Sequence, residues 1–580
     1  MSPQEPFRTG TKQPFLRISW LALALTFALS VAWTWKDWAD LEVLRLPDND
    51  DVARLQQVRD WLNGQRFNDL MQYRSGLGAG APMHWSRLAD AGPALLLLVL
   101  KPLVGSHAAE LVMAIAYPAI LFFVYLLLVA RIAVRLSDER SRVFAILLAA
   151  FAFPTISLFV PGRIDHHGLQ IVLILVLLDA VLAPAGLRSG IIAGIATAAS
   201  LAIGLETAPE IAAMMVVMGI GWLRGGRGSN HFASGFAASL GSVTLLLLAV
   251  AQPQVWPEAW CDGFTPNSTR ATLIVAAGWA LLGSAGAKLT TWRLRMAVGA
   301  ALGAVTLFLV MGLAPTCFAG PYGALDPLLQ KVWMRNVSEA RGLFEQKTVG
   351  TVIGYGGLVL AGAVAAMIRA RHDWRWLGFA LFMVLGAIAS ILQVRVTYIM
   401  AGVAVIPFAV AIARQNLPVK RLPLWLCGAG MLWNLLAVQI DTAQAGPVVL
   451  AKKAQNDCTA PGPIHAIAAL PRGRIMAPLE LDSYLLSMTP HHVIASLYHR
   501  NNSGDLAMYR FFLSVPERAH AQARAERVAY VALCPESLQE DGLAPLRPGT
   551  LVARLQSPQP PPEWLEPVSV GGAVRVYKVR

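Results

Sequence analysis

The chain has 580 residues, of which 56% are hydrophobic and only 14% are charged. This balance excludes the ordinary soluble globular class, whose members carry about 25% charged residues. The net charge of +13 is compatible with nucleic-acid binding, but the basic residues fall in alternate loops between apolar runs, which predicts membrane topology and no nucleic-acid partner.

Thirteen apolar runs follow one another over the first 440 positions, and each is long enough to cross roughly 30 Å of hydrocarbon. Because backbone polar groups cannot stay unpaired in lipid, each run is expected to be a helix. The runs lie at 18–36, 109–130, 143–161, 168–186, 189–205, 209–223, 232–251, 272–286, 296–315, 351–368, 376–393, 396–413 and 422–440. The first lacks a small-residue cleavage site, so we interpret it as a retained anchor, with a cleaved signal peptide as the alternative.

Basic residues mark one side of the membrane. They precede the first run and then recur in alternate loops, at Arg8, Lys12, Arg17, Arg131, Arg135, Arg140, Arg142, Arg188, Arg224, Arg227, Lys288, Arg293, Arg295, Arg369, Arg371, Arg375, Arg414, Lys420 and Arg421. By the positive-inside rule these loops are cytoplasmic. A multi-pass protein with about 13 transmembrane helices then has a cytoplasmic N-terminus and a periplasmic C-terminal domain, in a bacterial inner membrane.

Two long loops and a terminal domain lie on the predicted outer side. Loop 37–91 is polar, and the helical spacing of apolar residues from Val52 to Leu62 predicts an amphipathic helix at the membrane surface. Residues 92–104 predict a short buried or re-entrant helix, and the second long loop spans 316–350. Residues 1–440 therefore form a transmembrane domain. Residues 441–580 have the composition of a soluble α/β domain, with strands expected at 474–477, 492–496, 527–533 and 568–579.

Four of the five cysteines fall on the outer side, at Cys261, Cys317, Cys458 and Cys534. An oxidising periplasm allows two disulfides, Cys261–Cys317 and Cys458–Cys534. Four unpaired thiols are the alternative that the sequence leaves open.

Three acidic constellations fall in three different outer loops. The first is residues 48–51, where Asp48, Asp50 and Asp51 suit a hard metal ion; an exposed acidic turn is the alternative. The second is residues 165–167, where a carboxylate beside two imidazoles forms a ligand set for a divalent metal; a structural ion pair is the alternative. The third is Glu339, which alone would be an ordinary solvated glutamate.

Two arginines on the same side are candidates for binding a phosphate. Arg163 directly precedes the second acidic cluster, and Arg395 lies at an outer hinge between two apolar runs. Snorkelling to the interface is the competing interpretation of Arg395. Glu206 and Glu210, at another outer helix end, are weaker candidates. The polar run 498–502 either serves an acceptor or is a surface loop.

In order and sidedness, these motifs resemble those of the catalytic subunit of oligosaccharyltransferases, most closely the single-subunit archaeal and bacterial forms. That family has a GT-C fold with thirteen spans, two long outer loops and an outer C-terminal domain. Asn49-Asp50-Asp51, followed by Arg54 and Arg59, looks like its first acidic motif. Asp165-His166-His167 looks like its second motif, Glu339 is similar to its loop glutamate, and Arg395 is placed like its arginine near the lipid pyrophosphate.

One motif departs from the family pattern. The acceptor motif Trp-Trp-Asp-Tyr-Gly corresponds here to residues 479–484, which keep Asp482 and Tyr484 but lack the tryptophans. Recognition of an Asn-x-Ser/Thr acceptor does not follow from such a stretch. The resemblance therefore leaves a periplasmic protein site, a glycan or a lipid as the acceptor.

The resemblance implies transfer of a sugar or glycan from a polyprenyl-(pyro)phosphate donor, with inversion at the anomeric carbon. Asp50, Asp165 and His167 are expected to bind Mg²⁺ or Mn²⁺. Arg395, His84, His166 and Arg163 are expected to hold the donor. Asp50 and Glu339 are the expected catalytic residues, and Glu339, Asp482 and Tyr484 are expected to contact the acceptor.

Three other functions are weighed against this one. A polyprenyl-phosphate monosaccharide transferase acting on lipid or envelope polysaccharide has the same broad fold. A transporter or flippase of lipid-linked glycans would concentrate ionisable groups near the bilayer midplane, whereas the candidates here cluster at one outer face. A structural subunit of envelope assembly is the third.

Overall fold

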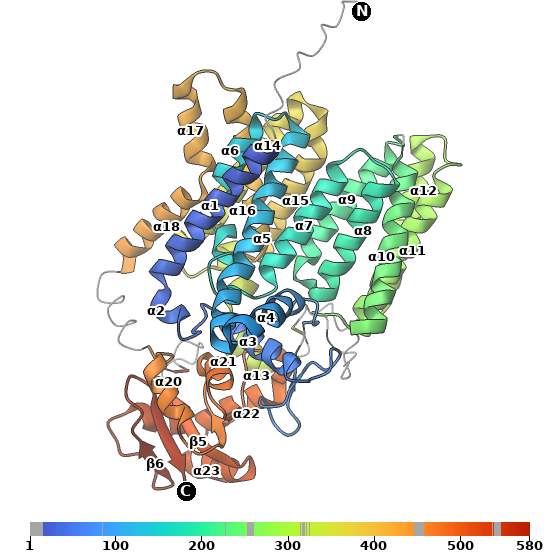
Figure 1. Ribbon diagram of the computed structural model, residues 1–580. Helices are drawn as coiled ribbons and strands as arrows, with labels where there is room; N and C mark the ends of the chain where they lie inside the picture. Colours follow the sequence, from blue (N-terminus) through green and yellow to red (C-terminus); the bar gives the residue numbers. More distant parts are fainter. Residues whose placement is uncertain are drawn as a thin grey trace, which may run out of the picture.

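The computed structural model describes residues 15–83, 85–226, 228–251, 260, 262–313, 315, 320, 322–323, 325–445, 457–535, 537–538 and 547–580. A tall bundle of helices forms most of the molecule, and a smaller region with a β-sheet lies at one end of it (Figure 1). His84, Cys261 and Cys317 lie outside the described residues, and the predicted Cys261–Cys317 disulfide lies there with them.

The elements up to residue 251 are α1 (Phe15–Lys36), α2 (Trp38–Leu41), α3 (Asn49–Leu62), β1 (Met71–Gln72), β2 (Ala81–Pro82), α4 (Ala91–Val104), α5 (Ser106–Leu136), α6 (Ser141–Ala149), η1 (Thr155–Leu158), α7 (His167–Leu182), α8 (Leu187–Ile203), η2 (Leu205–Thr207), α9 (Ala208–Leu223) and α10 (Ser229–Ala251). The next are α11 (Pro266–Ala285), α12 (Trp292–Leu313), α13 (Pro327–Val332), η4 (Met334–Asn336), η5 (Ser338–Ala340), η6 (Leu343–Glu345), α14 (Val349–His372), η7 (Trp374–Trp376), α15 (Leu377–Leu392), α16 (Val396–Arg414), α17 (Pro418–Gly428) and α18 (Gly430–Ala445).

The C-terminal region contains α20 (Pro461–Ala468), β3 (Arg474–Met476), α21 (Leu479–Met488), β4 (His492–Val493), η8 (His499–Asn501), α22 (Asn502–Leu513), α23 (Pro516–Ala525), β5 (Val528–Leu533), α24 (Leu551–Gln556), β6 (Leu565–Val568) and β7 (Arg575–Val579).

A single helix covers most of eleven of the thirteen apolar runs, but the expectation of one helix is wrong for the other two. In run 143–161 the helix ends at Ala149 and only a short 3₁₀ turn follows. Run 422–440 is divided between α17 and α18, which meet at an angle of 61°. Pro154 offers no N–H to continue the first helix. The carbonyl of Phe151 instead accepts the N–H of Met431 at 2.9 Å, so the two breaks lie together and satisfy each other's backbone.

Within the described residues, six helices are long and apolar enough to cross a membrane, or seven if the bent pair α17 and α18 counts as one span. The six are α5, α10, α12, α14, α15 extended by η7, and α16. The protein is thus a multi-pass membrane protein. The count of thirteen spans, the sidedness and the inner-membrane location stay predictions.

The helix predicted in the first outer loop forms, as α3, but it is not an amphipathic helix on a surface. Every residue from Asp51 to Val58 is buried, because α21 covers one side of α3 and α4 packs near another. The polar face of α3 can be buried because Arg54 forms ion pairs with carboxylates inside the protein. The following helix α4 does bury one face, with Pro93 and Leu97, while Leu95 is exposed.

The C-terminal sheet has the strand order β4-β3-β5-β7-β6. β3 is parallel to β4 and β5, whereas β7 is antiparallel to β5 and β6. Three predicted strands correspond to β3, β4 and β5. The single strand expected at 568–579 is instead a hairpin, because Gly571 and Gly572 adopt the positive φ angles of 75° and 65° that a tight reversal needs.

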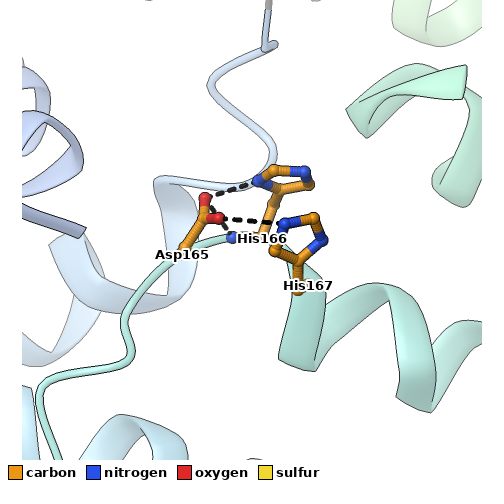
Figure 2. Close-up of side chains that lie close together, drawn as sticks. All are labelled: Asp165, His166 and His167. Carbon is orange, nitrogen blue, oxygen red and sulfur yellow. Dashed lines mark hydrogen bonds and ion pairs between the residues drawn. The ribbon is translucent and has the colours of Figure 1, made fainter. Parts of the chain in front are cut away.

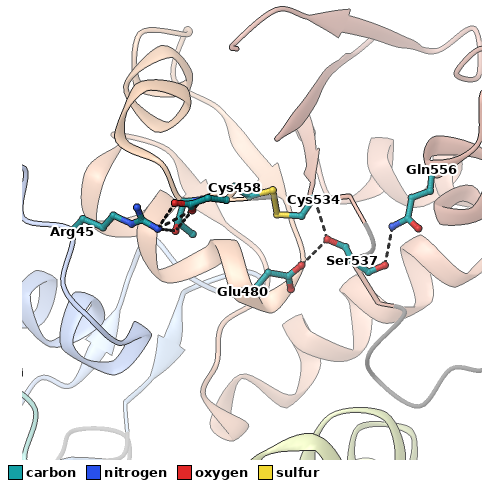
Figure 3. Close-up of a disulfide and its surroundings, with 8 residues drawn as sticks. Arg45, Cys458, Glu480, Cys534, Ser537 and Gln556 are labelled. Carbon is teal, nitrogen blue, oxygen red and sulfur yellow. Dashed lines mark hydrogen bonds and ion pairs between the residues drawn. A yellow bond between two sulfur atoms is a disulfide. The ribbon is translucent and has the colours of Figure 1, made fainter. Parts of the chain in front are cut away.

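Outer loop 37–91 is bonded to the C-terminal region at two places. Arg45 binds Asp457 and the hydroxyl of Thr459, each at 2.8 Å, beside the disulfide that joins Cys458 to Cys534 (Figure 3). Farther along the loop, the N–H of Val493 in β4 donates to the carbonyl of Arg74 at 2.9 Å. The loop therefore extends the sheet, and the helix that carries Asp50 is held between the bundle and the C-terminal region.

Candidate active site

A cavity of about 630 Å³ opens where the outer loops, the helix ends and the C-terminal region meet. Five predicted site residues line it: Asp50, Arg163, His167, Glu339 and Arg395. They come from α3, the turn before α7, the first residue of α7, η5 and the residue before α16. The structure therefore brings together side chains that are spread over more than half of the chain.

The first acidic segment begins α3. Asp48 caps this helix, and its Oδ1 accepts the N–H of Asp50 at 3.2 Å. Arg163 pairs with Asp48 at 2.8 Å and with Asp51 at 3.0 Å, and Asp51 also accepts the backbone N–H of Asp165 at 2.8 Å. Arg163 thus fixes the first acidic segment against the second.

The second acidic motif is compact (Figure 2). The carboxylate of Asp165 accepts the backbone N–H of His166 at 2.7 Å and contacts Nδ1 of the same ring. Its Oδ2 lies 3.5 Å from Nε2 of His167. The ligand atoms that these three residues offer lie within 4.8 Å of one another, which is close enough for one metal ion.

His166 is enclosed rather than presented to the cavity. Its ring is 0% exposed, with Asp165 at Nδ1 and Glu206 at Nε2. Burial opposes the charged form, but the two carboxylates outweigh it and raise the pKa of His166 to about 9. His166 is therefore an imidazolium that holds two carboxylates in place, whereas His167 lines the cavity.

The buried guanidinium of Arg54 also holds the second acidic motif in place. Arg54 donates to Asp90 at 2.7 Å and to Asp165 at 2.9 Å, and it lies over the ring of Trp85 at 4.6 Å. Removing one partner of such a buried ion pair would leave an uncompensated buried charge, which is strongly destabilising. Arg54 therefore fixes the position of Asp165, a role that sequence reasoning did not assign to it.

Arg395 also lines the cavity. Its Nη1 lies 3.6 Å from Glu206, and its Nη2 donates to the hydroxyl of Tyr322 at 3.3 Å. Glu206 thus joins the histidine motif to the arginine. Glu339 accepts a hydrogen bond from the hydroxyl of Tyr398 at 3.4 Å. From the sequence Glu206 is a weaker candidate, with Glu210, at an outer helix end, and the structure places it between the histidine motif and Arg395.

The electrostatics of the cavity favour a cation. Burial, followed by the charges of Asp165, Asp48 and Glu339, raises the pKa of Asp50 well above its ordinary value. Asp165 Oδ2 is buried without a hydrogen-bond partner among the described residues. Carboxylates that repel one another and a buried orphan oxygen fit a divalent cation, and Asp165 and His167 offer ligand atoms within 4.8 Å of each other for it.

Two predicted acceptor residues lie away from the cavity. Asp482 borders a separate space of about 10 Å³ together with Ser75 and Ser496. The hydroxyl of Tyr484 donates to the carbonyl of Leu46 at 3.2 Å. Both side chains therefore pack between α21 and the first outer loop.

No protein-family model matches the sequence, and none of the curated proteins matches it. Solved structures do match. The oligosaccharyltransferase AglB of Archaeoglobus fulgidus, in complex with an inhibitory peptide and a dolichol-phosphate, superposes with a TM-score of 0.67 at 15% identity, over 91% of this chain and 70% of that chain. The protein has the GT-C fold of this oligosaccharyltransferase. The predicted fold class is thereby confirmed.

Two further structures of the same archaeal enzyme match the GT-C fold of the chain. One is tethered to an acceptor peptide containing the NVT sequon, with a TM-score of 0.60 at 15% identity, over 91% of this chain and 70% of that one. The other is a complex with Zn and sulfate, with a TM-score of 0.60 at 15% identity, over 90% and 68% of the two chains.

Proposed function

We propose that the protein is a membrane glycosyltransferase, which transfers a sugar or glycan from a polyprenyl-(pyro)phosphate donor to an acceptor on the periplasmic face of a bacterial inner membrane. The observation that carries this proposal is the single cavity lined by Asp50, His167, Glu339 and Arg395. An arginine for a phosphate and carboxylates with an imidazole for a cation are the groups such a transfer needs. The dolichol-phosphate and acceptor peptide of the archaeal structures support the same class of substrates.

The donor phosphate is assigned to Arg395. Tyr322 and Glu206 hold the guanidinium at the cavity wall, and such a group binds phosphate oxygens with two parallel hydrogen bonds. Arg163 is already neutralised by two carboxylates, so it acts on the donor mainly through the position of α3. His84 stays a prediction.

Asp50, Asp165 and His167 are assigned to a divalent cation, Mg²⁺ or Mn²⁺. When bound, this cation supplies Lewis-acid neutralisation of the leaving phosphate, generally worth several kcal/mol. Arg54 and His166 orient Asp165 for that role, as residues behind metal ligands commonly do.

The acceptor is assigned to the side of the cavity bordered by Glu339 and Asp50. Tyr398 holds the Glu339 carboxylate, which then orients the acceptor for attack on the face of the anomeric carbon opposite the phosphate, with inversion. For Asp482 and Tyr484 direct contact with the acceptor stays a prediction, since their positions favour support of α3.

The test uses membranes supplied with radiolabelled polyprenyl-linked sugar and measures transfer of the label. Asp50→Ala and Asp165→Ala are each expected to abolish transfer, while Asp40→Ala, an exposed carboxylate of the same loop, keeps the wild-type rate. Full turnover in both site variants would remove the assignment.

A further inference from the structure

A second, much smaller cavity of about 20 Å³ adjoins the main one. His167, Glu206 and Arg395 line both cavities, so these three side chains lie between the two spaces. Glu210, in the first turn of α9, lines the small cavity and not the main one. A space of this size can hold one water molecule, which needs about 10–15 Å³.

The small cavity is bordered by a buried acceptor and a buried donor that are both unpaired. Glu210 is 1% exposed, and its Oε2 has no hydrogen-bond partner among the described residues. Nε of Arg395 is also buried and has no partner within the described part of the chain. The two side chains interact electrostatically. A buried polar group without a hydrogen bond is costly, and more so when it is charged. One water molecule between Oε2 and Nε would satisfy both atoms.

The other nitrogens of Arg395 already have neighbours. Arginine carries five N–H groups, one on Nε and two on each Nη. Nη2 donates to the hydroxyl of Tyr322, and Nη1 lies 3.6 Å from Glu206. Once Nε is bound, one N–H remains on each Nη. These two groups form the forked edge that binds two oxygens of a phosphate in parallel.

We propose that Glu210 is a positioning residue for Arg395: one water molecule in the small cavity joins Oε2 of Glu210 to Nε, so that the guanidinium presents its Nη1–Nη2 edge to the donor phosphate. This inference rests on the proposed function, in which Arg395 binds that phosphate. Glu210 does not touch the substrate, and it acts only through the orientation of the guanidinium.

A lysine in place of Arg395 separates this role from others. Lysine keeps the positive charge, but it has no planar fork and no donor at the position of Nε. If Glu210 acts through Nε, its replacement changes nothing further in the Arg395→Lys background. A Glu210 that acts on the metal through His167, which also lines the small cavity, would keep its effect in that background and would shift the Mn²⁺ requirement.

The experiment measures the retention of radiolabelled polyprenyl phosphate by the purified full-length protein in the presence of Mn²⁺. Glu210→Leu is expected to raise the Kd about 10- to 100-fold, as for the loss of one hydrogen bond to a charged group. The Mn²⁺ concentration for half-maximal retention should stay the same. Glu210→Gln keeps an oxygen that accepts from the water, so its Kd should stay close to that of the wild type.

The double variant and the control complete the design. Glu210→Leu combined with Arg395→Lys should bind polyprenyl phosphate no more weakly than Arg395→Lys alone. Glu517→Leu is the matched control, because Glu517 also follows a proline in the first turn of a helix, α23, and is exposed. Glu210→Met replaces Glu210→Leu in the same comparison if the leucine variant does not elute as a folded protein.

Four results would overturn the inference. Equal retention by Glu210→Leu and the wild type, with retention weakened in Arg395→Lys, would remove Glu210 and keep the phosphate at Arg395. A further loss in the double variant, or a shifted Mn²⁺ midpoint in Glu210→Leu, would give Glu210 a role that does not pass through Nε. An equal loss in Glu210→Gln and Glu210→Leu would remove the bridging water. Retention that Arg395→Lys leaves unchanged would overturn the donor assignment of the proposed function and this inference together.

Discussion

Replacing Glu206 by glutamine tests the link between the histidine motif and the arginine. The change keeps the side-chain shape and removes a negative charge that lies 3.6 Å from Arg395 and 3.9 Å from His167. At an effective dielectric constant of about 20, a pair at that first distance is worth at most about 4 to 5 kcal/mol before desolvation is subtracted. Loss of a group behind metal ligands typically costs 10- to 100-fold in metal affinity, or about 1.4 to 2.8 kcal/mol.

We therefore expect the Mn²⁺ concentration for half-maximal sugar transfer to rise 10- to 100-fold in Glu206→Gln. At saturating Mn²⁺ the rate of sugar transfer should recover more in Glu206→Gln than in a variant that lacks one of the proposed metal ligands. The assay is a Mn²⁺ titration of label transfer in purified protein, with Glu42→Gln, an exposed glutamate of the first outer loop, as control. An unchanged titration midpoint would refute the assignment of Glu206 as a support of the metal site.

Three more predictions follow from the same structure. Asp50→Asn should lower sugar transfer at least 100-fold. The pKa of Asp50 is raised, so protons compete with the metal for its carboxylate. The Mn²⁺ concentration that the wild type requires should therefore rise as pH falls. Replacing both Cys458 and Cys534 by alanine opens a loop of 76 residues and should lower the free energy of unfolding by about 2 to 4 kcal/mol in denaturant titrations; an equal stability would contradict this. Burial raises the pKa of Asp482 well above its ordinary value, so its protonated form favours folding and the wild type loses stability as pH rises. Asp482→Asn should therefore melt higher than the wild type at neutral pH and equally at pH below 4, and a difference independent of pH would count against it.

The convergence of the acidic motifs was predictable from sequence, because chain order and sidedness place Asp50, Asp165 and Glu339 at the same end of the bundle. The residues that hold these acidic motifs in place could not be predicted from the sequence. Arg54 reaches Asp165 across 111 positions, and no periodicity reports such a contact. The apolar spacing in α3 shows one face of the helix, whereas its burial on other faces depends on partners from α21.

The breaks within the apolar helices also could not be predicted from the sequence. An apolar run such as 143–161 satisfies the length criterion for a span whether or not its helix is continuous. The break after Ala149 is tolerated because Met431, far along the chain, satisfies the carbonyl of Phe151. Similarly, Arg500 meets Asp262 across 238 positions, so the cavity wall that Asp262 lines shows no local signature in the sequence.

The bond between Arg74 and Val493 has a consequence for biogenesis. The first outer loop leaves the ribosome early, but the strand that its backbone pairs with is synthesised more than 400 residues later. Until the C-terminal region has been made, α3 lacks the cover of α21, and Asp50 has no fixed place. Residues 497–499, which follow β4, also line the cavity, so the complete cavity forms only when translation is nearly finished.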